Sequence, residues 1–178
     1  SPAIVGTADA NTIVAIFDGT TLLGATTADG AGAWSFTPPT PLAAGSHAIT
    51  AVATDLAGNV GAASQALVVT IDATAPTAPH IRGLAPADDT GSSSTDGVTG
   101  VAAPVLLGTA ETGSVVTVRE GAATLATVTA DASGAWAATI TLSAGPHALT
   151  ATAVDLAGNA SPVSLTATIE RRVGAPAA

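Results

Sequence analysis

The sequence predicts an all-β protein made of two tandem β-sandwich domains in an elongated array. Three observations support this prediction: the chain repeats itself after about 100 residues, its apolar runs are short and alternate with polar residues, and turn-forming residues separate the runs. The chain shows no helical periodicity. Its 178 residues are enough for two domains of about 90 residues, each able to bury a core.

The internal repeat is the strongest of these observations. Thr27–Trp34 recurs as Thr129–Trp136, and the sequence DLAGN at Asp55–Asn59 recurs intact at Asp155–Asn159. The offset between the copies is 102 residues before the tryptophan and 100 after it, so a two-residue insertion or deletion falls near residues 38–41. Two copies of this length indicate two homologous domains. We assign the domains to residues 1–72 and 80–170, the linker to 73–79, and a C-terminal tail or the start of another linker to 171–178.

Each copy consists of short predicted strands. In the second copy, Val116 and Val118 alternate with Thr117 and Arg119, which indicates a strand with one buried and one wet face. Turns rich in glycine, aspartate and asparagine separate such runs. Seven short strands in about 95 residues are typical of an aligned β-sandwich. The predicted strands are His80–Leu84, Pro104–Thr109, Ser114–Glu120, Thr124–Ala130, Ala135–Leu142, His147–Val154 and Val163–Ile169.

The two copies differ at their N-terminal ends. The second begins with the His80–Leu84 strand and a polar loop at Asp88–Gly97, whereas the first starts at Ser1–Pro2, level with Ala103–Pro104. We therefore expect the first sandwich to lack its leading strand, to have one exposed sheet edge, and to be part of a longer protein. The prolines of the linker between the copies favour a short, stiff connector.

The composition argues against several functional classes. Thirteen acidic residues against four arginines give a net charge of −9, so the chain lacks a basic face for nucleic acid. Its longest apolar runs, such as Val101–Leu107, are far shorter than the roughly 20 residues that span a bilayer. Since the chain has no cysteine, its stability must come from packing, from a metal ion or from neighbouring repeats. We expect any export signal to lie elsewhere in the parent protein.

The sequence offers no catalytic constellation. His47 and His147 occupy matching positions, but Ser46 precedes the first and Pro146 the second, so a Ser–His pair is not kept between the copies. We therefore do not expect an enzyme, and we assign no catalytic or cofactor-binding residue. His80 has no counterpart in the first copy, and we expect it at the surface of a strand edge.

The matched tryptophans, Trp34 and Trp136, allow two interpretations. Exposed rings would stack on sugars, whereas rings held between the sheets would organise the two cores. Because both rings recur at the same register beside alanine, we expect core positions.

In this order, the features resemble the bacterial immunoglobulin-like repeats of giant adhesins and biofilm-associated proteins exported by type I secretion. The resemblance covers essentially the whole chain. It implies two immunoglobulin-like β-sandwiches, display at the bacterial cell surface, adhesion or a stalk that carries an adhesive tip, and calcium held near domain junctions. The two arginines that follow Glu170 depart from the pattern and argue against a further calcium junction there. The matching segments are the linker Asp72–Pro79, the loop Asp88–Gly97, the turn Gly108–Glu111, the strand entry Asp131–Trp136 and both DLAGN turns.

The first candidate calcium site lies at the junction between the domains. Strand connections alternate between the ends of a sandwich, so the turns with Glu111 and Asp155 share the end that faces the preceding domain, where Asp72 arrives. Calcium takes six to eight oxygen ligands, at about 2.3–2.6 Å. We hypothesise a site of Asp72, Glu111 and Asp155, completed by backbone carbonyls or the Asn159 amide, that stiffens the junction. The alternative is that Asp155 and Asn159 only build a turn and that Glu111 is solvated.

A second candidate calcium site lies in the loop at the opposite end of the second domain. Asp88, Asp89 and Asp96 are three carboxylates within nine residues, among glycine and serine, and one ion would fit among them. Their spacing departs from that of an EF-hand loop. The alternative is a mobile polar loop.

The leading hypothesis is a structural or adhesive extracellular repeat of a bacterial surface adhesin, acting as a calcium-stiffened spacer in cell adhesion or biofilm formation. We expect a monomer whose partners are neighbouring repeats of the same chain. The sequence does not identify a host or cell-surface ligand. We expect neither nucleic-acid binding nor membrane insertion. The alternative is a glycan- or protein-binding module, including one appended to a carbohydrate-active enzyme. A glycan-binding module predicts exposed aromatic platforms, and the four aromatic residues leave almost none to spare.

Overall fold

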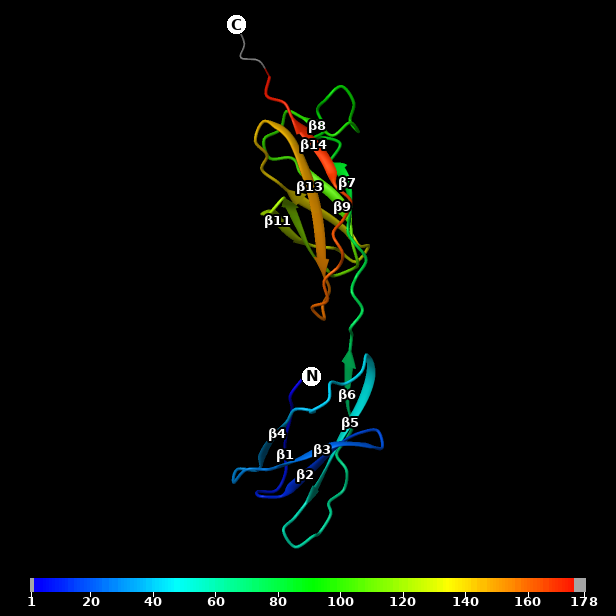
Figure 1. Cartoon of the computed structure of the whole chain (residues 1–178), viewed down its shortest axis with the longest axis vertical. Helices are drawn as coiled ribbons and strands as arrows, with labels where there is room; N and C mark the ends of the chain where they lie inside the picture. Colours follow the sequence, from blue (N-terminus) through cyan, green and yellow to red (C-terminus); the bar gives the residue numbers. More distant parts are fainter. Residues whose placement is uncertain (1, 175–178) are drawn as a thin grey trace. The chain divides into compact units, whose positions relative to one another are not determined.

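The computed structural model describes residues 2–174, which form β-strands joined by turns and loops (Figure 1). Of the predicted tail at 171–178, residues 175–178 lie outside the described part. The chain divides into two compact units, Ser1–Ala73 and Thr74–Ala178. In the part that the structure describes, no helix is long and apolar enough to cross a membrane.

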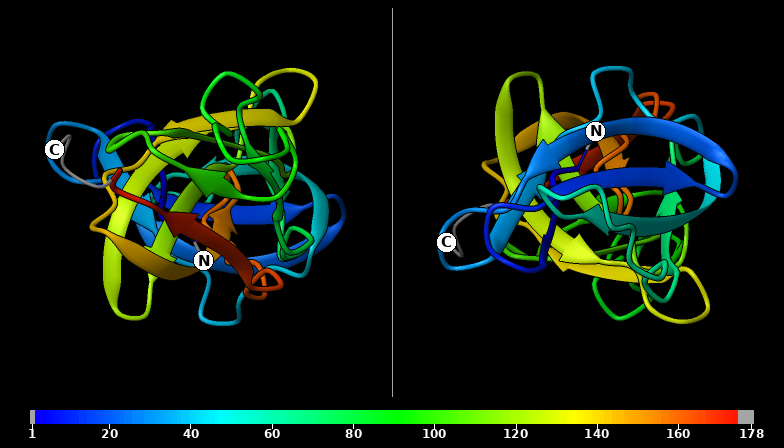
Figure 2. Two further views of the ribbon diagram at one scale, coloured as in Figure 1. Left: turned by 90° about the horizontal axis from the view of Figure 1, so that it is seen from above. Right: turned by 90° about the horizontal axis from the view of Figure 1, so that it is seen from below.

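The second unit is a sandwich of two sheets, which lies in front in the left view of Figure 2. All neighbouring strands in it are antiparallel except β14 and β8, which run parallel. The larger sheet has the order β11 (Ala123–Thr129), β10 (Val115–Glu120), β13 (Gly145–Val154), β14 (Ala167–Arg171) and β8 (Val98–Thr99). The smaller sheet has the order β12 (Ala135–Thr139), β9 (Val105–Thr109) and β7 (His80–Leu84).

The first unit has the same strands without counterparts of β7 and β8 among residues 2–73. Even an irregularity recurs: the β2–β3 pairing shifts register after Ile16, and the β10–β11 pairing shifts at the matching place after Val118. The larger sheet has the order β3 (Thr21–Thr27), β2 (Ile13–Asp18), β5 (Gly45–Thr54) and β6 (Leu67–Ile71). The smaller sheet pairs β1 (Ile4–Thr7) with β4 (Ala33–Phe36).

The prediction of an all-β fold with two tandem sandwiches is confirmed, and the leading strand of the second unit has the predicted bounds. The last predicted strand, Val163–Ile169, begins later than expected, at Ala167. The reason is that serine side chains replace backbone carbonyls beside β13. The Ser161 hydroxyl accepts the Ala153 N–H (2.8 Å), and the Ser164 hydroxyl accepts the Ala151 N–H (2.9 Å).

The second unit has the larger core. Thirteen apolar side chains are buried there, against five in the first unit. Ile81 and Leu84 of β7 contribute to this larger core. Four positions that are buried in the second unit are only partly buried in the first, namely Trp34, Ala51, Ala53 and Val69 against Trp136, Ala151, Ala153 and Ile169.

Each tryptophan lies opposite a glycine on the neighbouring strand. Trp136 on β12 pairs with Gly108 on β9, and Trp34 on β4 pairs with Gly6 on β1. A Cβ atom on either glycine would meet the indole ring, so only glycine allows the ring to lie against the strand. Trp136 is 4% exposed within the second core, as predicted, whereas Trp34 packs against the first core but stays partly open.

This difference predicts unequal effects of removing the two rings. Trp136→Ala should destabilise the second unit by about 3–5 kcal/mol, because it leaves a cavity in a closed core. Trp34→Ala should cost the first unit clearly less, because that ring already borders open space. Chemical denaturation of the two variants and the wild type measures both effects. Equal losses of stability would contradict the conclusion that the core is closed around Trp136 but partly open around Trp34.

Candidate functional site

The turn at Asp155–Asn159 follows β13 and is built by its own acidic side chain. Asp155 Oδ1 accepts the N–H groups of Ala157 (2.9 Å) and Asn159 (2.8 Å), and Oδ2 accepts the Asn159 amide at 2.8 Å. Gly158 supplies the left-handed conformation that the turn requires, at φ = 92°. These bonds lower the pKa of Asp155, chiefly through the Asn159 amide.

The matching turn at Asp55–Asn59 has the same construction in the first unit. Asp55 accepts the N–H groups of Ala57 (2.9 Å) and Asn59 (2.8 Å) and the Asn59 amide (2.7 Å). Its pKa is likewise lowered, again chiefly by the asparagine amide. The recurrence means that this motif builds a turn in both units, with both carboxylate oxygens already accepting hydrogen bonds.

The turns that carry Glu111 and Asp155 lie at the same end of the second unit. A Cβ atom on Gly113 would lie 3.8 Å from Leu156 Cδ1, which puts the two turns side by side. The exposed Glu111 also lines a shallow pocket with Thr77 and His80, so the chain enters the unit at this end. Two acidic residues of the predicted junction site therefore belong to adjacent turns.

The remaining acidic residue of that site, Asp72, belongs to the first unit. It directly follows β6 and its side chain is exposed. The predicted calcium site therefore combines residues of both units, namely Asp72 with Glu111, Asp155 and Asn159. It stays a prediction.

The loop between β7 and β8 contains the second candidate site. Asp88 accepts the Val105 N–H at 2.8 Å and thereby anchors the loop to β9. The exposed Asp96 accepts the N–H groups of Val98 (3.0 Å) and Ser93 (3.2 Å). Its pKa is lowered, chiefly by the Val98 N–H, with smaller effects of hydrogen bonds from the loop serines.

Asp89 differs from the other acidic residues of this loop, because it is buried. Its side chain is 7% exposed, and Oδ2 accepts the Gly97 N–H at 3.3 Å. Its other oxygen, Oδ1, is buried and accepts no hydrogen bond within the described residues. A buried carboxylate oxygen without a partner is energetically costly, and a cation is one group that would satisfy it.

Across residues 2–174, no three histidine or acidic side chains form a group that could hold a metal ion. The three aspartates of the loop are therefore not gathered as one carboxylate cluster. Asp88 is bonded to β9, while Asp89 and Asp96 are close enough for Asp89 to affect the pKa of Asp96. Of the two predicted calcium sites, the loop has the donor set that better fits a cation, because one buried oxygen of Asp89 has no hydrogen-bond donor.

A histidine–carboxylate pair in the first unit was not predicted. His47 Nδ1 lies 2.6 Å from Asp18 Oδ2, and His47 Nε2 lies 2.8 Å from the Ala43 carbonyl oxygen. A neutral imidazole has one N–H and satisfies one of these acceptors, whereas the protonated ring satisfies both. The bond to Asp18, followed by the bond to Ala43, raises the pKa of His47 above its ordinary value.

The second unit repeats this arrangement. His147 Nδ1 lies 2.9 Å from Glu120 Oε1, and Nε2 lies 2.9 Å from the Ser143 carbonyl oxygen. The signal was present in the sequence, since an acidic residue recurs at the end of the strand that pairs with the histidine-bearing strand. The residue beside each histidine, Ser46 or Pro146, does not indicate this pair. The pair ties each strand to the loop before it, which is a structural role.

A family model described as "Bacterial Ig-like domain" matches residues 1–73 and 74–171. The chain belongs to the bacterial Ig-like domain family. The resemblance seen in the sequence is thereby confirmed, and the two units are two Ig-like repeats. No curated protein sequence is significantly similar to the chain.

Several solved structures are similar to these two Ig-like repeats. The fibronectin(III)-like modules of CbhA from Clostridium thermocellum share 18% identity at a TM-score of 0.51, over 96% of this chain and 85% of that one. The BSP domain of a biofilm-associated protein shares 22% identity at a TM-score of 0.41, over 97% and 28%. A Ca²⁺-stabilized, ice-binding adhesin of an Antarctic bacterium shares 22% identity at 0.45, over 97% and 43%. The chain thus spans less than half of the latter two, and the similarity concerns the fold.

We expect the stability of the first Ig-like repeat to fall as the pH rises through neutrality. Because folding raises the pKa of His47, its stabilising effect is fully present below the ordinary value of 6.5 and is lost as the pH rises through the higher folded pKa. Thermal melting between about pH 5.5 and about pH 8.5 avoids the range in which most carboxylates titrate. His47→Gln should flatten the profile of the first repeat, whereas the matched His147→Gln should leave it unchanged. A wild-type profile without slope would contradict the argument.

Proposed function

We propose that this chain is a structural, adhesive spacer of a bacterial surface protein, which extends a binding part away from the cell. The observation that carries this proposal is the tandem repetition of one β-sandwich. Each repeat has its own core and its own strand pairs, so repeats can be joined in series without a change of fold. Membership of the bacterial Ig-like family supports the same function and an extracellular location at the cell surface. We assign the chain no catalytic role.

A glycan-binding module is the competing function, and the positions of the aromatic rings argue against it. Trp136 is buried in the second core, and Trp34 and Phe36 pack against the first. Phe17 is also partly buried. Sugar-binding surfaces use exposed rings for stacking, so these rings serve packing instead.

The spacer function predicts how far the chain reaches when its copy number changes. We would display a reporter domain on cells through one, two or three copies of residues 1–174 and measure its height by fluorescence interferometry. A spacer of folded repeats should add a constant height per copy, whereas a Gly/Ser linker of equal length should gain height as about the square root of its length. Binding of the fragment itself to a glycan array would favour the competing function.

We further propose that calcium binds in the loop of the second repeat. Asp89 and Asp96 would provide carboxylate oxygens, and serine hydroxyls or loop carbonyls would complete the shell, with Asp88 bracing the loop against β9. Two neighbouring carboxylates repel each other when both are ionised, unless a cation or a shared proton lies between them. Bound calcium would therefore satisfy the buried Asp89 oxygen and remove this repulsion.

This site predicts a difference in stability between the wild type and Asp89→Asn that appears only when calcium is added. Asp89→Asn should be as stable as the wild type in chelator, because it removes a buried charge without changing shape. With calcium at 100 times the dissociation constant of the loop site, the wild type should gain about 2.7 kcal/mol more than Asp89→Asn. The matched control is Asp131→Asn, whose carboxylate bonds the N–H groups of its own turn at the other end of the repeat. An equal response of wild type and Asp89→Asn to calcium would exclude the site.

We propose a second calcium ion between the repeats, held by Asp72, Glu111 and Asp155 with the Asn159 amide or backbone carbonyls. The shared end of the Glu111 and Asp155 turns supports this proposal. An ion bonded from both repeats would penalise bending and so stiffen the spacer. Since the Asp155 oxygens also build a turn, its substitution has an effect on stability that does not depend on calcium.

Small-angle scattering with calcium and with chelator would test this junction. The maximum dimension of the wild type should increase with calcium, and Asp72→Ala and Asp155→Ala should abolish the increase. Asp55→Ala is the matched control, because it removes the same turn-building carboxylate from the first repeat. If Asp55→Ala and Asp155→Ala behave alike towards calcium, Asp155 has only its role in the turn.

A further inference from the structure

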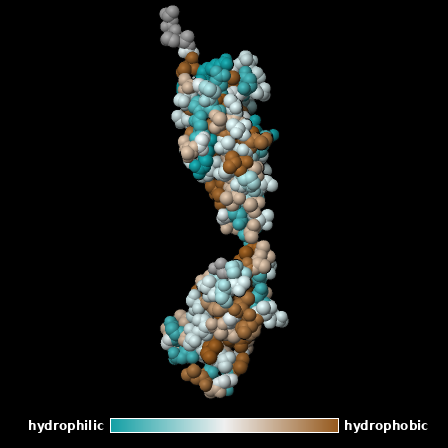
Figure 3. All heavy atoms as spheres, viewed as in Figure 1, coloured by the Kyte–Doolittle hydropathy of each residue, from teal (hydrophilic) through white to brown (hydrophobic). Residues whose placement is uncertain are grey.

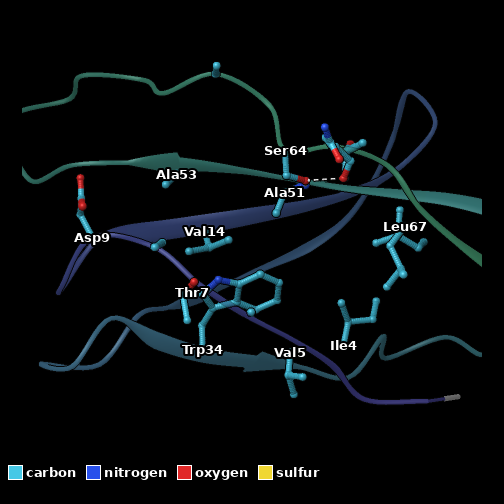
Figure 4. Close-up of a pocket in the computed structure, with 16 residues that line it drawn as sticks. Ile4, Val5, Thr7, Asp9, Val14, Trp34, Ala51, Ala53, Ser64 and Leu67 are labelled. Carbon is cyan, nitrogen blue, oxygen red and sulfur yellow. Dashed lines mark hydrogen bonds between the residues drawn. The ribbon is translucent and has the colours of Figure 1, made fainter.

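The larger sheet of the first repeat has one side that faces away from the core. Along β2, Val14 and Ile16 are buried in the core, and Figure 4 shows Val14 on the side of the sheet that faces Trp34. Successive side chains of a strand point to opposite sides of a sheet, so the residues that alternate with the buried ones lie on the other side. We call that other side the outer face. Among its apolar residues are Ala15 and Phe17 of β2, Leu22 and Ala25 of β3, Val52 of β5 and Val68 of β6.

The matching face of the second repeat is polar, although its strands pair in the same way. At the six equivalent positions the second repeat has threonine five times and arginine once. The two repeats therefore share one framework but differ in the chemistry of this face. In the same order, the residues of the second repeat are Thr117, Arg119, Thr124, Thr127, Thr152 and Thr168.

The outer face is accessible to the same degree in both repeats. The succession of exposed, half-buried and buried residues along β2 is identical to that along β10, and the succession along β3 is identical to that along β11. The second repeat contains β7, β8 and the loop between them, and its face is open in their presence. The exposure of this face is therefore a property of the larger sheet and does not depend on those segments.

Large apolar side chains are exposed on the outer face of the first repeat. Leu22 is 58% exposed and Val68 is 67% exposed. Phe17, which is half-buried, pairs with Leu22 on β3 and with Thr50 on β5. Figure 3 shows apolar surface on this repeat. Apolar surface that continues across neighbouring strands is typical of an interaction site.

The outer face of the first repeat also lacks charge. The five aspartates of residues 1–73 lie in turns or at strand ends, and this segment contains no glutamate, lysine or arginine. When two such faces pack together, only uncharged side chains lose water. The matching face of the second repeat is a poorer partner, because Arg119 would lose water without gaining a carboxylate. Charge therefore favours a second copy of the same face.

The size of the outer face indicates how strong this pairing is. Four neighbouring strands of about six residues present a face of about 20 Å by about 20 Å. This area is smaller than the roughly 800 Å² per partner of a standard protein interface. One pair of faces therefore forms a weak complex.

We propose that two copies of the chain bind each other through the outer faces of their first repeats, as two β-sheets pack face to face. Because each copy contributes the same face, the pair has two-fold symmetry. The chain is a monomer when dilute, and the interaction gains strength where many copies are displayed side by side. It links separate chains, which goes beyond the role of a spacer, and it does not depend on calcium.

Sedimentation equilibrium of the whole chain tests this pairing. The wild type should show a monomer–dimer equilibrium with a dissociation constant of about 0.1–1 mM, as expected for a small interface. Association should strengthen as NaCl is raised from about 0.05 M to about 0.5 M, because salt screens the repulsion between acidic chains. An association between oppositely charged surfaces would weaken instead.

Two variants of the first repeat locate the interface. Phe17→Arg, Leu22→Thr and Val68→Thr together install the residues of the second repeat, which its matching strands accommodate, and should weaken association at least tenfold. Leu56→Thr is the control, because this leucine is 86% exposed but lies in the turn after β5, away from the outer face. It should leave association unchanged. Thermal melting by circular dichroism checks that both variants are folded.

The reverse exchange tests whether the face is sufficient. Arg119→Phe, Thr124→Leu and Thr168→Val together give the second repeat an apolar face. The chain then has two binding faces, and self-association should strengthen at least tenfold.

Three outcomes would overturn the proposal. One is a wild type that stays monomeric at the highest concentration, and binding of that monomer to phosphatidylcholine vesicles would make a lipid surface the occupant. Another is equal association of the wild type and the threefold variant of the first repeat, which would place the interface elsewhere. The last is a reverse exchange that leaves the association of the chain unchanged.

Discussion

The closing of two small sheets over one aliphatic core is the constraint on which each repeat depends. Aromatic residues make up 2% of the chain, so most of the stabilising burial must come from valine, isoleucine, leucine and alanine. Such side chains are small, and a core built from them needs strands on every side. In the second repeat β7 adds a third strand to the smaller sheet, and Trp136, Ala151 and Ala153 are buried in the core. Without an equivalent strand among residues 2–73, the same positions of the first repeat remain partly open.

The acidic residues divide into two groups according to what their oxygens already bond. Asp55, Asp131 and Asp155 accept N–H groups of their own turns, and these bonds fix the turn while they lower the pKa of the carboxylate. Asp89 is buried and leaves one oxygen without a hydrogen bond in the described part of the chain. An acidic protein can therefore use most of its carboxylates to fix its fold. Burial distinguishes these carboxylates from Asp89, whose unbonded oxygen is suited to bind a cation. Spacing along the sequence does not make this distinction.

Much of the fold could be predicted because the relevant physics is local. Alternation of Val116 and Val118 with polar neighbours defines the buried face of β10, and the DLAGN turns form from bonds within five residues. The prediction was wrong where side chains replaced the backbone, since the hydroxyls of Ser161 and Ser164 delay the start of the last strand. The candidate site was less predictable. Burial of Asp89 depends on how the whole loop folds against the sheets, which residue spacing does not reveal.

The sequence by itself determined that the chain has two copies of one all-β unit and where most strands lie. These properties follow from periodicity and repetition, which are read along the chain. Only the tertiary structure decided that His47 contacts Asp18, that Trp34 is less buried than Trp136, and that Asp89 is buried. Each of these depends on contacts between segments distant in sequence, and the pairing of strands brings those segments together.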